Sequence, residues 1–308
     1  GELLKLMDDD DKGAVGKACE GIQSVLELCG PHALMPVSTD CLTKTHALLA
    51  RKSPCQMAEE AEGEVEGGDL LTEDDDHDTF MTSVCDLVGT YGRIMGPHFA
   101  KYLNQFLPAI CAYAKQSRPS SDRSMAVGCL GEIAQELGVG ISEHFETIFY
   151  PASLACLADE DDNVKRNAAF TIGVCCEGLG ELVVSQYPQI LSTISPLFQI
   201  DSSASDQSAA CVDNAAAAVS RMITTCPQAV QPMNQVLPVL LKALPLKNDM
   251  TENETVYKCL LGLLQANHPD VAVNKAEFLR VFQSAMAEGS NVDDELKVSI
   301  NQALAALA

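Results

Sequence analysis

Four apolar segments of the chain each contain a proline, and they recur at a nearly constant distance. The prolines are Pro108, Pro151, Pro196 and Pro238, which are separated by 43, 45 and 42 residues. A polar turn and a second segment rich in small residues follow each of them, such as RSMAVGCLGEIAQELG and VKRNAAFTIGVCCEGLG. A period of about 40–47 residues with two helices per unit is typical of HEAT and armadillo solenoids. The repeat therefore predicts an all-α chain of stacked antiparallel helix pairs.

Each repeat is expected to contain a helix A, which carries the proline, and a helix B, which is rich in alanine and glycine. Proline lacks a backbone N–H and crowds the carbonyl four residues earlier, so it should kink each A helix. No stretch shows the sustained alternation that marks a β-strand. We expect one HEAT-repeat solenoid over residues 1–308, with about six to seven repeats wound into a right-handed superhelix. The expected helices are B at 9–29, A at 32–52, B at 75–95, A at 98–116, B at 121–138, A at 142–158, B at 161–180, A at 186–199, B at 206–225, A at 231–244, B at 252–267, and a closing pair at 273–287 and 292–307.

The composition agrees with helices that pack closely on helices. Alanine, leucine and valine dominate, tryptophan is absent, and aromatic residues make up 5% of the chain. The 13 cysteines include no C-x-x-C pair and lie scattered over apolar segments, where cysteine acts as a small hydrophobic residue. We therefore expect free thiols and a reducing compartment, the cytoplasm or the nucleus.

The charge of the chain restricts the classes of partner. Acidic residues outnumber basic ones 43 to 20, which gives a net charge of −23. Binding to nucleic acid phosphates requires clustered lysine and arginine, so nucleic acid is not an expected partner. We also expect no apolar run close to the roughly 18–20 residues that span a bilayer, and hence no membrane partner. The charge favours a cationic protein partner.

The sequence offers no catalytic or metal-binding motif. Its six histidines lack paired metal-ligand spacing, and no nucleophile elbow, P-loop or dinucleotide-binding glycine motif is present. The segment DDDDKGAVGKACE fails as a calcium loop in either register. A start at Asp8 puts Gly13 at the sixth position but Cys19 at the twelfth, and a start at Asp9 gains Glu20 but loses the glycine. We expect no enzyme activity, no metal and no cofactor.

Residues 59–78 hold eleven acidic residues and no lysine or arginine. Three glycines and few apolar residues predict a mobile acidic loop inserted between helices, with expected bounds 53–74. It is either a solvated insertion or a flexible anionic arm that attracts a basic cargo over a long range. The acids assigned to this arm are Glu64, Glu66, Asp74, Asp75 and Asp76.

Carboxylates also gather where several B helices are expected to begin, as in Asp8–Asp11 and Asp159–Asp162. Such residues cap free backbone N–H groups and lie at the positive end of the helix dipole, each contributing about 0.3–1 kcal/mol. These acids therefore have a sufficient structural explanation, whether or not they also contact a partner.

The segment DEDDNVKRNAAF resembles the HEAT pattern of an acidic turn followed by valine and a basic residue. The motifs VDNAA and LPLK resemble the C-terminal region of the importin-β superfamily, and within it the importin-4 branch. This resemblance implies a nuclear import receptor in cytoplasm and nucleus whose cargo includes histones and ribosomal proteins. It implies that Ran-GTP binds mainly to N-terminal repeats outside this chain. It also allows nucleoporins as partners.

Asparagines recur near the starts of three successive B helices, at Asn167, Asn214 and Asn253. By the resemblance, B helices line the concave face, so these amides and nearby carboxylates are candidates to accept hydrogen bonds from lysine ammonium groups of an extended cargo segment. Buried capping asparagines would give the same pattern, and both interpretations stay open. The carboxylates in this candidate cargo-binding set are Asp161, Asp162, Glu177, Asp213, Glu252 and Glu254.

Two functions follow. The first is a nuclear transport receptor fragment that binds basic nuclear-localisation segments of histones or ribosomal proteins on an acidic concave surface. The alternative is a HEAT-repeat scaffold subunit of a multiprotein complex, which does not need its acids concentrated on the B-helix face.

Overall fold

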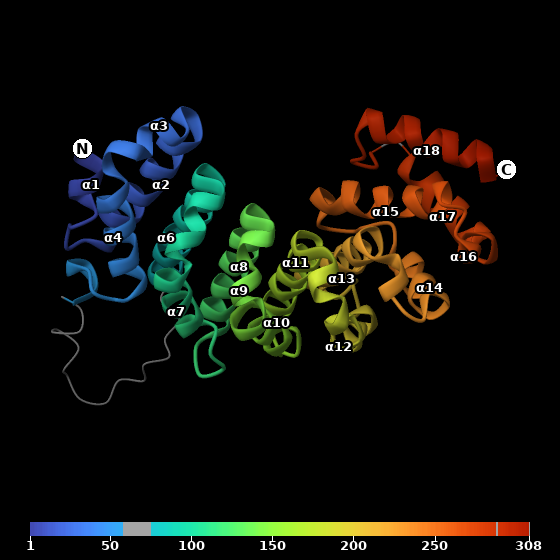
Figure 1. Cartoon of the computed structure of the whole chain (residues 1–308), viewed down its shortest axis with the longest axis horizontal. Coiled ribbons are helices and arrows are strands. Elements are labelled where there is room, and N and C mark those ends of the chain that lie inside the picture. The colour runs from blue at the N-terminus through green and yellow to red at the C-terminus, as the bar shows by residue number, and fades with distance from the viewer. Residues whose placement is uncertain (58–74, 288, 308) are drawn as a thin grey trace. The chain divides into compact units, whose positions relative to one another are not determined.

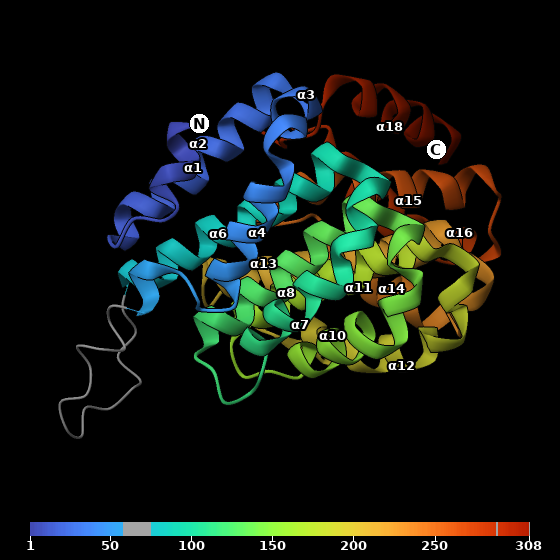
Figure 2. The same cartoon turned by 60° about the vertical axis from the view of Figure 1, so that its left-hand side comes forward.

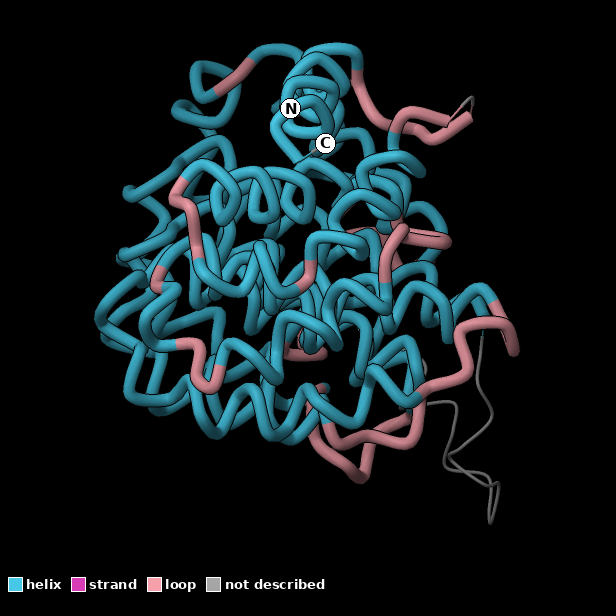
Figure 3. The backbone as a smooth tube through the Cα atoms, turned by 90° about the vertical axis from the view of Figure 1, so that its right-hand side faces the viewer, coloured by secondary structure: helices cyan, strands magenta, loops and turns pink. Residues whose placement is uncertain are grey.

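The computed structural model describes residues 1–57, 75–287 and 289–307, and over these residues the backbone is helical with short connections and no strand (Figures 1 and 3). The chain divides into two compact units, Gly1–Ala152 (unit 1) and Ser153–Ala308 (unit 2). Each unit consists of antiparallel helix pairs, which confirms the predicted all-α HEAT-repeat fold. The single continuous solenoid and its right-handed winding remain predictions.

Unit 1 has two layers of helices, which can be followed in Figures 1 and 2. The B helices α2, α6 and α8 pack side by side, and α4 and α7 of the other layer pack on α6 and α8 respectively. The helices of this unit are α1 (Glu2–Leu6), α2 (Lys12–Cys29), α3 (Pro31–Leu34), α4 (Ser38–Leu49), α6 (Asp75–Met95), α7 (Leu103–Tyr113), α8 (Ser120–Leu137) and α9 (Ser142–His144). The helix α10 (Tyr150–Leu157) crosses the boundary at residue 152.

Unit 2 repeats this arrangement. The B helices α11, α13, α15 and α18 pack in that order, and α12, α14 and α17 pack on α13, α17 and α18 respectively. The helices are α11 (Asp162–Leu179), α12 (Tyr187–Ile194), α13 (Asp206–Thr225), α14 (Met233–Ala243), α15 (Asn253–Gln265), α16 (Pro269–Val273), α17 (Lys275–Ala285) and α18 (Asp294–Leu307).

Side-chain caps begin several B helices where the sequence places acids or serines. Asp11 accepts from the backbone N–H of Ala14 at 2.7 Å, and Asp161 accepts from Val164 at 3.1 Å. Each cap satisfies a backbone donor that the first turn of a helix leaves free. These contacts explain why acidic runs precede α2 and α11.

Glycines end three of the B helices. Gly30, Gly138 and Gly180 follow α2, α8 and α11 with φ of 66°, 48° and 57°, and each donates its backbone N–H to a carbonyl four residues earlier. A positive φ costs glycine little, so the chain turns sharply here into the next A helix.

The four repeated prolines occupy two kinds of position. Pro108 and Pro238 lie inside α7 and α14, as predicted. Pro151 is the second residue of α10, directly after a π-helical turn at Phe145–Phe149. Pro196 is the second residue of the 3-10 segment Ser195–Gln199, which follows α12. In these two A helices the proline therefore lies in the first turn of a new helical segment, because it cannot donate to the preceding turn.

The core consists of small apolar side chains and thiols. All 13 cysteines lie among the described residues as free thiols, and 11 of them are buried. Burial raises the pKa of Cys19 and of Cys259 to about 12, so these thiols stay protonated and act as apolar groups.

Two sequence expectations need correction. The acidic loop does not begin at residue 53, because residues 54–57 form a helical turn in which Cys55 and Gln56 are buried. Gln56 donates from Nε2 to the carbonyl of Leu48 at 3.0 Å, which ties this turn to α4.

The second correction concerns apolar length. The helical stretch Asp162–Gln199 is long and apolar enough to cross a membrane by length and composition alone. This is weak evidence for a membrane span, because a buried core helix has the same length and composition. More than half of the most apolar 18 residues of the stretch are buried within the protein. The stretch also contains the turn at Gly180.

Candidate functional site

The predicted cargo-binding residues all lie in unit 2, on or beside α11, α13 and α15, whose helices are neighbours in the B layer. In the structure these residues form two groups. One group is buried and hydrogen bonds to other residues of the chain, and the other group reaches solvent. The buried group is Asp213, Asn214, Glu252 and Asn253.

Asp213 and Asn214 hold the loop that follows α14. Asp213 is 1% exposed, and its carboxylate accepts backbone N–H groups of Lys247, Asn248 and Asp249 at 2.7–3.2 Å. Burial raises the pKa of Asp213, and these three hydrogen bonds oppose the rise. Asn214 donates from Nδ2 to Oδ2 of Asp249 at 2.9 Å. Both residues therefore position the turn before α15.

Asn253 and Glu252 also have partners in the fold. Asn253 donates from Nδ2 to the carbonyl of Asn291 at 3.3 Å, in the loop before α18. Glu252 accepts from Nη2 of Arg221 at 3.0 Å, and both side chains are buried. Two of the three recurring asparagines, Asn214 and Asn253, thus have the buried structural role that the sequence left open as the alternative.

Arg221 is the cation that connects this region. It lies on α13, is 8% exposed, and donates from Nε to Oε2 of Glu177 on α11 at 3.1 Å. Its Nη1 lies 2.9 Å from Oε2 of Glu252, an ion-pair contact without hydrogen-bond geometry. The guanidinium carbon lies 5.8 Å from the ring centre of Phe170, within cation–π range. One side chain therefore links α11, α13 and the start of α15.

The close approach of α11 to α13 depends on Gly173. A Cβ at this position would lie 2.9 Å from Cα of Ala218 and 3.5 Å from Cδ of Arg221. Only glycine leaves room for the two backbones and for the arginine stem that runs between them.

Most of the solvent-facing group lies on α11. Asn167 and Phe170 are half-buried and Glu177 is exposed, with 57% of its side chain accessible. At 100° per residue, these three positions fall on one face of the helix. An amide, an aromatic ring and a carboxylate along one face can contact the backbone, the aliphatic stem and the ammonium group of a lysine-containing segment.

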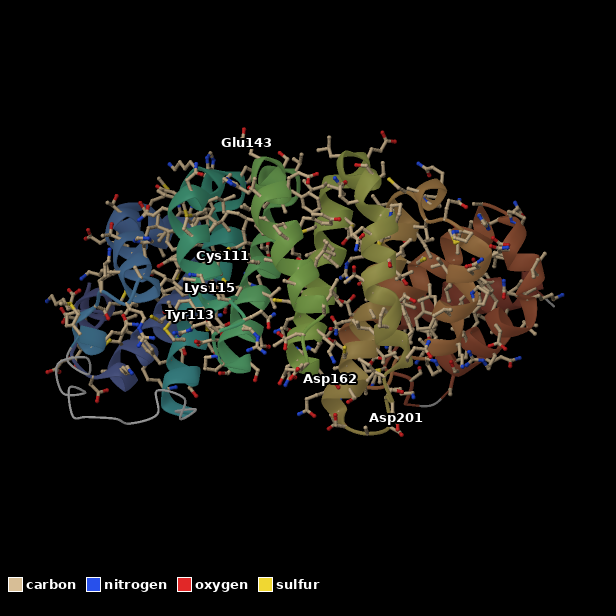
Figure 4. All side chains as sticks on the ribbon, turned by 90° about the horizontal axis from the view of Figure 1, so that it is seen from below. Cys111, Tyr113, Lys115, Glu143, Asp162 and Asp201 are labelled. Carbon is tan, nitrogen blue, oxygen red and sulfur yellow. The ribbon has the colours of Figure 1, made fainter. Side chains whose placement is uncertain are left out.

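Carboxylates continue along one edge of unit 2. Asp162 and Asp201, labelled in Figure 4, lie at the same edge, where the loops leading into α11 and α13 run. Burial alone would raise the pKa of Asp162, but hydrogen bonds from Lys165 and Ser208 outweigh burial and hold that pKa below its ordinary value. Asp162 therefore carries a stable negative charge in a fixed position.

The remaining predicted acids have different positions. Asp161 caps α11, and Glu254 forms an exposed ion pair with Lys258 on α15. Of the acidic-arm residues, Asp75 and Asp76 belong to α6, and Glu64, Glu66 and Asp74 lie outside the described residues.

Arg221 and Phe170 were not among the residues predicted from the sequence. Arg221 is the one basic residue in the alanine-rich helix α13, and an isolated cation in such a helix is a signal that it has a buried anionic partner. Phe170 gave no signal, because the sequence does not show which residues of α11 reach solvent.

Unit 1 contains a second acidic group that was not predicted. Burial, followed by repulsion from Asp86 on α6, raises the pKa of Glu132 on α8. Burial, followed by repulsion from Glu20 on α2, raises the pKa of Asp86. Within the described residues, no cluster of histidine, cysteine and carboxylate side chains has the geometry of a metal site.

Comparison with known proteins gave relatives over most of the chain. It is 30% identical to importin-4 of Mus musculus over 305 residues, which cover 97% of the chain and 27% of that protein. It is 29% identical over 256 residues to a probable importin subunit beta-4 of Schizosaccharomyces pombe, which cover 81% of the chain and 23% of that protein. The chain thus spans about a quarter of the length of these relatives. No family model matches the sequence.

Solved structures agree on the fold. The crystal structure of the karyopherin Kap121p bound to the SUMO protease Ulp1p superposes with a TM-score of 0.74 at 16% identity, covering 100% of this chain and 28% of that one. Kap121p bound to RanGTP gives a TM-score of 0.71 at 14% identity over 99% of this chain and 27% of that one. Kap121p bound to Nup53p gives 0.66 at 16% identity over 99% and 29%.

Proposed function

The chain belongs to the importin-β family of HEAT-repeat proteins, and we propose that it forms part of a nuclear transport receptor whose unit 2 binds a lysine-rich segment of its cargo. Importins and karyopherins are transport receptors and not enzymes, which agrees with the prediction that the chain is not an enzyme. The proposed cargo class is histone tails or basic segments of ribosomal proteins, carried between cytoplasm and nucleus.

The observation that supports this site most directly is the solvent-facing stripe of α11. Asn167, Phe170 and Glu177 lie along one face of the helix, and Asp161 and Asp162 lie at its N-terminal end. The carboxylates at the two ends of α11 are about 23 Å apart along the axis, because a helix rises about 1.5 Å per residue. An extended segment of about seven residues spans that distance.

The buried residues have a supporting role in this proposal. Asp213, Asn214 and Asn253 hold the turns that precede α15 and α18, and they leave few polar atoms for a ligand. Glu254 at the start of α15 contributes an exposed charge. The cargo is therefore expected to contact mainly α11 and the adjoining edge of unit 2.

The other partners follow from the relatives. RanGTP and the nucleoporin Nup53p are bound by Kap121p in its crystal structures, and we propose the same two partner classes for the complete receptor that contains this chain. Ran is expected to act mainly through N-terminal repeats of that receptor.

The proposal is tested by the binding of a fluorescent lysine-rich peptide at two salt concentrations. Glu177→Gln and Asn167→Ala should each weaken binding by about three- to tenfold, because a charge-assisted contact contributes roughly 1.5–3 kcal/mol in full and less when it is partly exposed. Glu181→Gln removes the same charge from an exposed residue just beyond α11 and should change binding little. Acetylation of the peptide lysines should abolish most of the affinity.

If salt weakens binding while Glu181→Gln and Glu177→Gln reduce the affinity equally, the peptide is attracted by the overall charge and does not bind at a specific site. Absence of any binding to the lysine-rich peptide would favour the scaffold alternative.

A further inference from the structure

Arg221 forms an ion pair with Glu177, the carboxylate to which a lysine of the proposed cargo segment would bind. Nε of Arg221 donates to Oε2 of Glu177 at 3.1 Å. Arg221 is a buried residue of the same protein chain. A cargo lysine that approaches Glu177 meets a carboxylate that already has a cationic partner.

The two carboxylates that hold Arg221 differ in their exposure. Glu252 is buried and contacts both terminal nitrogens of the guanidinium, at 3.0 and 2.9 Å. Glu177 is largely exposed and contacts only Nε. Loss of a buried partner leaves a charge without solvation, whereas an exposed carboxylate exchanges partners with water at little cost. The contact with Glu177 is therefore the one that can be released.

We propose that Arg221 is an internal competitor of the cargo lysine for Glu177, so that cargo binding and the link between α11 and α13 are negatively coupled. This inference rests on the proposed function. The stem of Arg221 passes Gly173, its guanidinium carbon lies 5.8 Å from the ring centre of Phe170, and its Nη2 donates to Glu252. When Glu177 turns to a cargo ammonium, α11 loses this polar contact with α13. By linkage, the Arg221–Glu177 contact weakens cargo binding by the same factor by which bound cargo weakens that contact.

This coupling gives the receptor a way to keep a moderate affinity for basic segments. A carboxylate on α11 without an internal partner would bind many cationic peptides. Glu177 instead binds a segment only if the other contacts of that segment along α11 offset the loss of the pair with Arg221. Arg221 is thus a specificity-determining residue of the proposed site, although it need not touch the cargo.

The test uses the double variant Arg221→Gln with Glu252→Gln. The two changes cancel in net charge, so the long-range attraction for a basic peptide is unchanged, and the two glutamines can still hydrogen bond to each other. Glu177 is then left without its internal partner. We expect the affinity for the lysine-rich peptide to rise by about threefold, the size expected for release of one partly exposed ion pair. Adding Glu177→Gln to the double variant should remove this gain.

The matched control is Glu2→Gln with Lys5→Gln, which removes an exposed ion pair of α1 without changing net charge and should leave affinity unchanged. Circular dichroism and the melting temperature report whether each variant is folded. If the double variant does not fold, Arg221→Lys replaces it, because a single ammonium group cannot hold both carboxylates as the guanidinium fork does. This variant should also raise affinity.

The outcomes separate the two proposals. If the wild-type chain does not bind the peptide, the proposed function is wrong. If it binds and the folded variants bind equally or more weakly, Arg221 does not compete for Glu177 and the inference is wrong.

Discussion

The carboxyl group of Glu132 on α8 lies against the backbone of Gly89 on α6. A Cβ on Gly89 would be 2.0 Å from Oε2 of Glu132, so a side chain at residue 89 would occupy the place of this carboxyl group. The residue as a whole is exposed, but its carboxyl end is covered by α6. Burial, followed by repulsion from Asp86, raises the pKa of Glu132 to about 7. Arg93 opposes this rise, but its guanidinium donates to Glu27 on α2 at 2.8 Å.

Glu132→Gln should therefore stabilise unit 1 at neutral and alkaline pH. The folded state keeps a proton on Glu132 up to about pH 7, whereas the unfolded chain releases it near the ordinary value of 4.5. The free energy of unfolding of the wild type thus falls as the pH rises between these two values, and the loss is complete above pH 7. Glutamine removes this loss. We expect the melting temperature at about pH 8 to rise by a few degrees, as about 1 kcal/mol would give in a domain of this size.

At about pH 5 the same variant should differ little from the wild type, because Glu132 is then mostly protonated in the folded state and the loss has only begun. Glu143→Gln is the matched control, since Glu143 is exposed on α9 (Figure 4). A melting temperature that Glu132→Gln raises equally at both pH values would show that helix propensity, and not titration, is the cause.

Asp213→Asn should loosen the loop before α15. The carboxylate accepts three backbone N–H groups, and an asparagine presents one oxygen to them and two N–H groups that repel them. We expect a loss of about 2 kcal/mol in the free energy of unfolding, because buried donors are left without full partners. Urea denaturation measures the loss, and hydrogen exchange at Lys247, Asn248 and Asp249 should become faster.

Asp206→Asn is the control for this change, because Asp206 is exposed in the first turn of the same helix. It should cost no more than about 0.5 kcal/mol. Unchanged exchange at residues 247–249 in Asp213→Asn would mean that other contacts hold the loop.

The fold could be predicted from the sequence because the same helix pattern recurs in several repeats, so a wrong assignment in one repeat does not change the fold class. The helix expected at 75–95 coincides with α6 and that at 206–225 with α13, since caps, glycines and apolar spacing agree in each unit. The exact role of each proline could not be predicted. Pro108 remains inside its helix, whereas Pro196 lies in the first turn of a new segment, and the difference depends on how the surrounding turns pack.

The candidate site was predictable only in part, because spacing along a helix does not show what packs on it. Asn167 and Asn214 are each followed by a pair of alanines and lie near the start of an expected B helix. In the structure Asn167 is half-buried on α11, whereas Asn214 is buried and donates to Asp249 in the neighbouring loop. Arg221 could not be paired with Glu177 and Glu252 from the sequence, because its partners are 44 and 31 residues away in the chain.

Gly173→Ala should weaken the contact between α11 and α13. The new Cβ would lie 2.9 Å from Cα of Ala218, a backbone atom that cannot move without shifting α13. We expect a loss of about 1–3 kcal/mol in the free energy of unfolding, as for other overpacked interfaces. Gly262→Ala is the matched control, because Gly262 lies inside α15 and a Cβ there would meet no atom within 4 Å. This control should gain about 0.5–1 kcal/mol from the higher helix propensity of alanine. Urea denaturation of the two variants measures both signs, and a stabilising Gly173→Ala would show that α11 and α13 are farther apart than the structure places them.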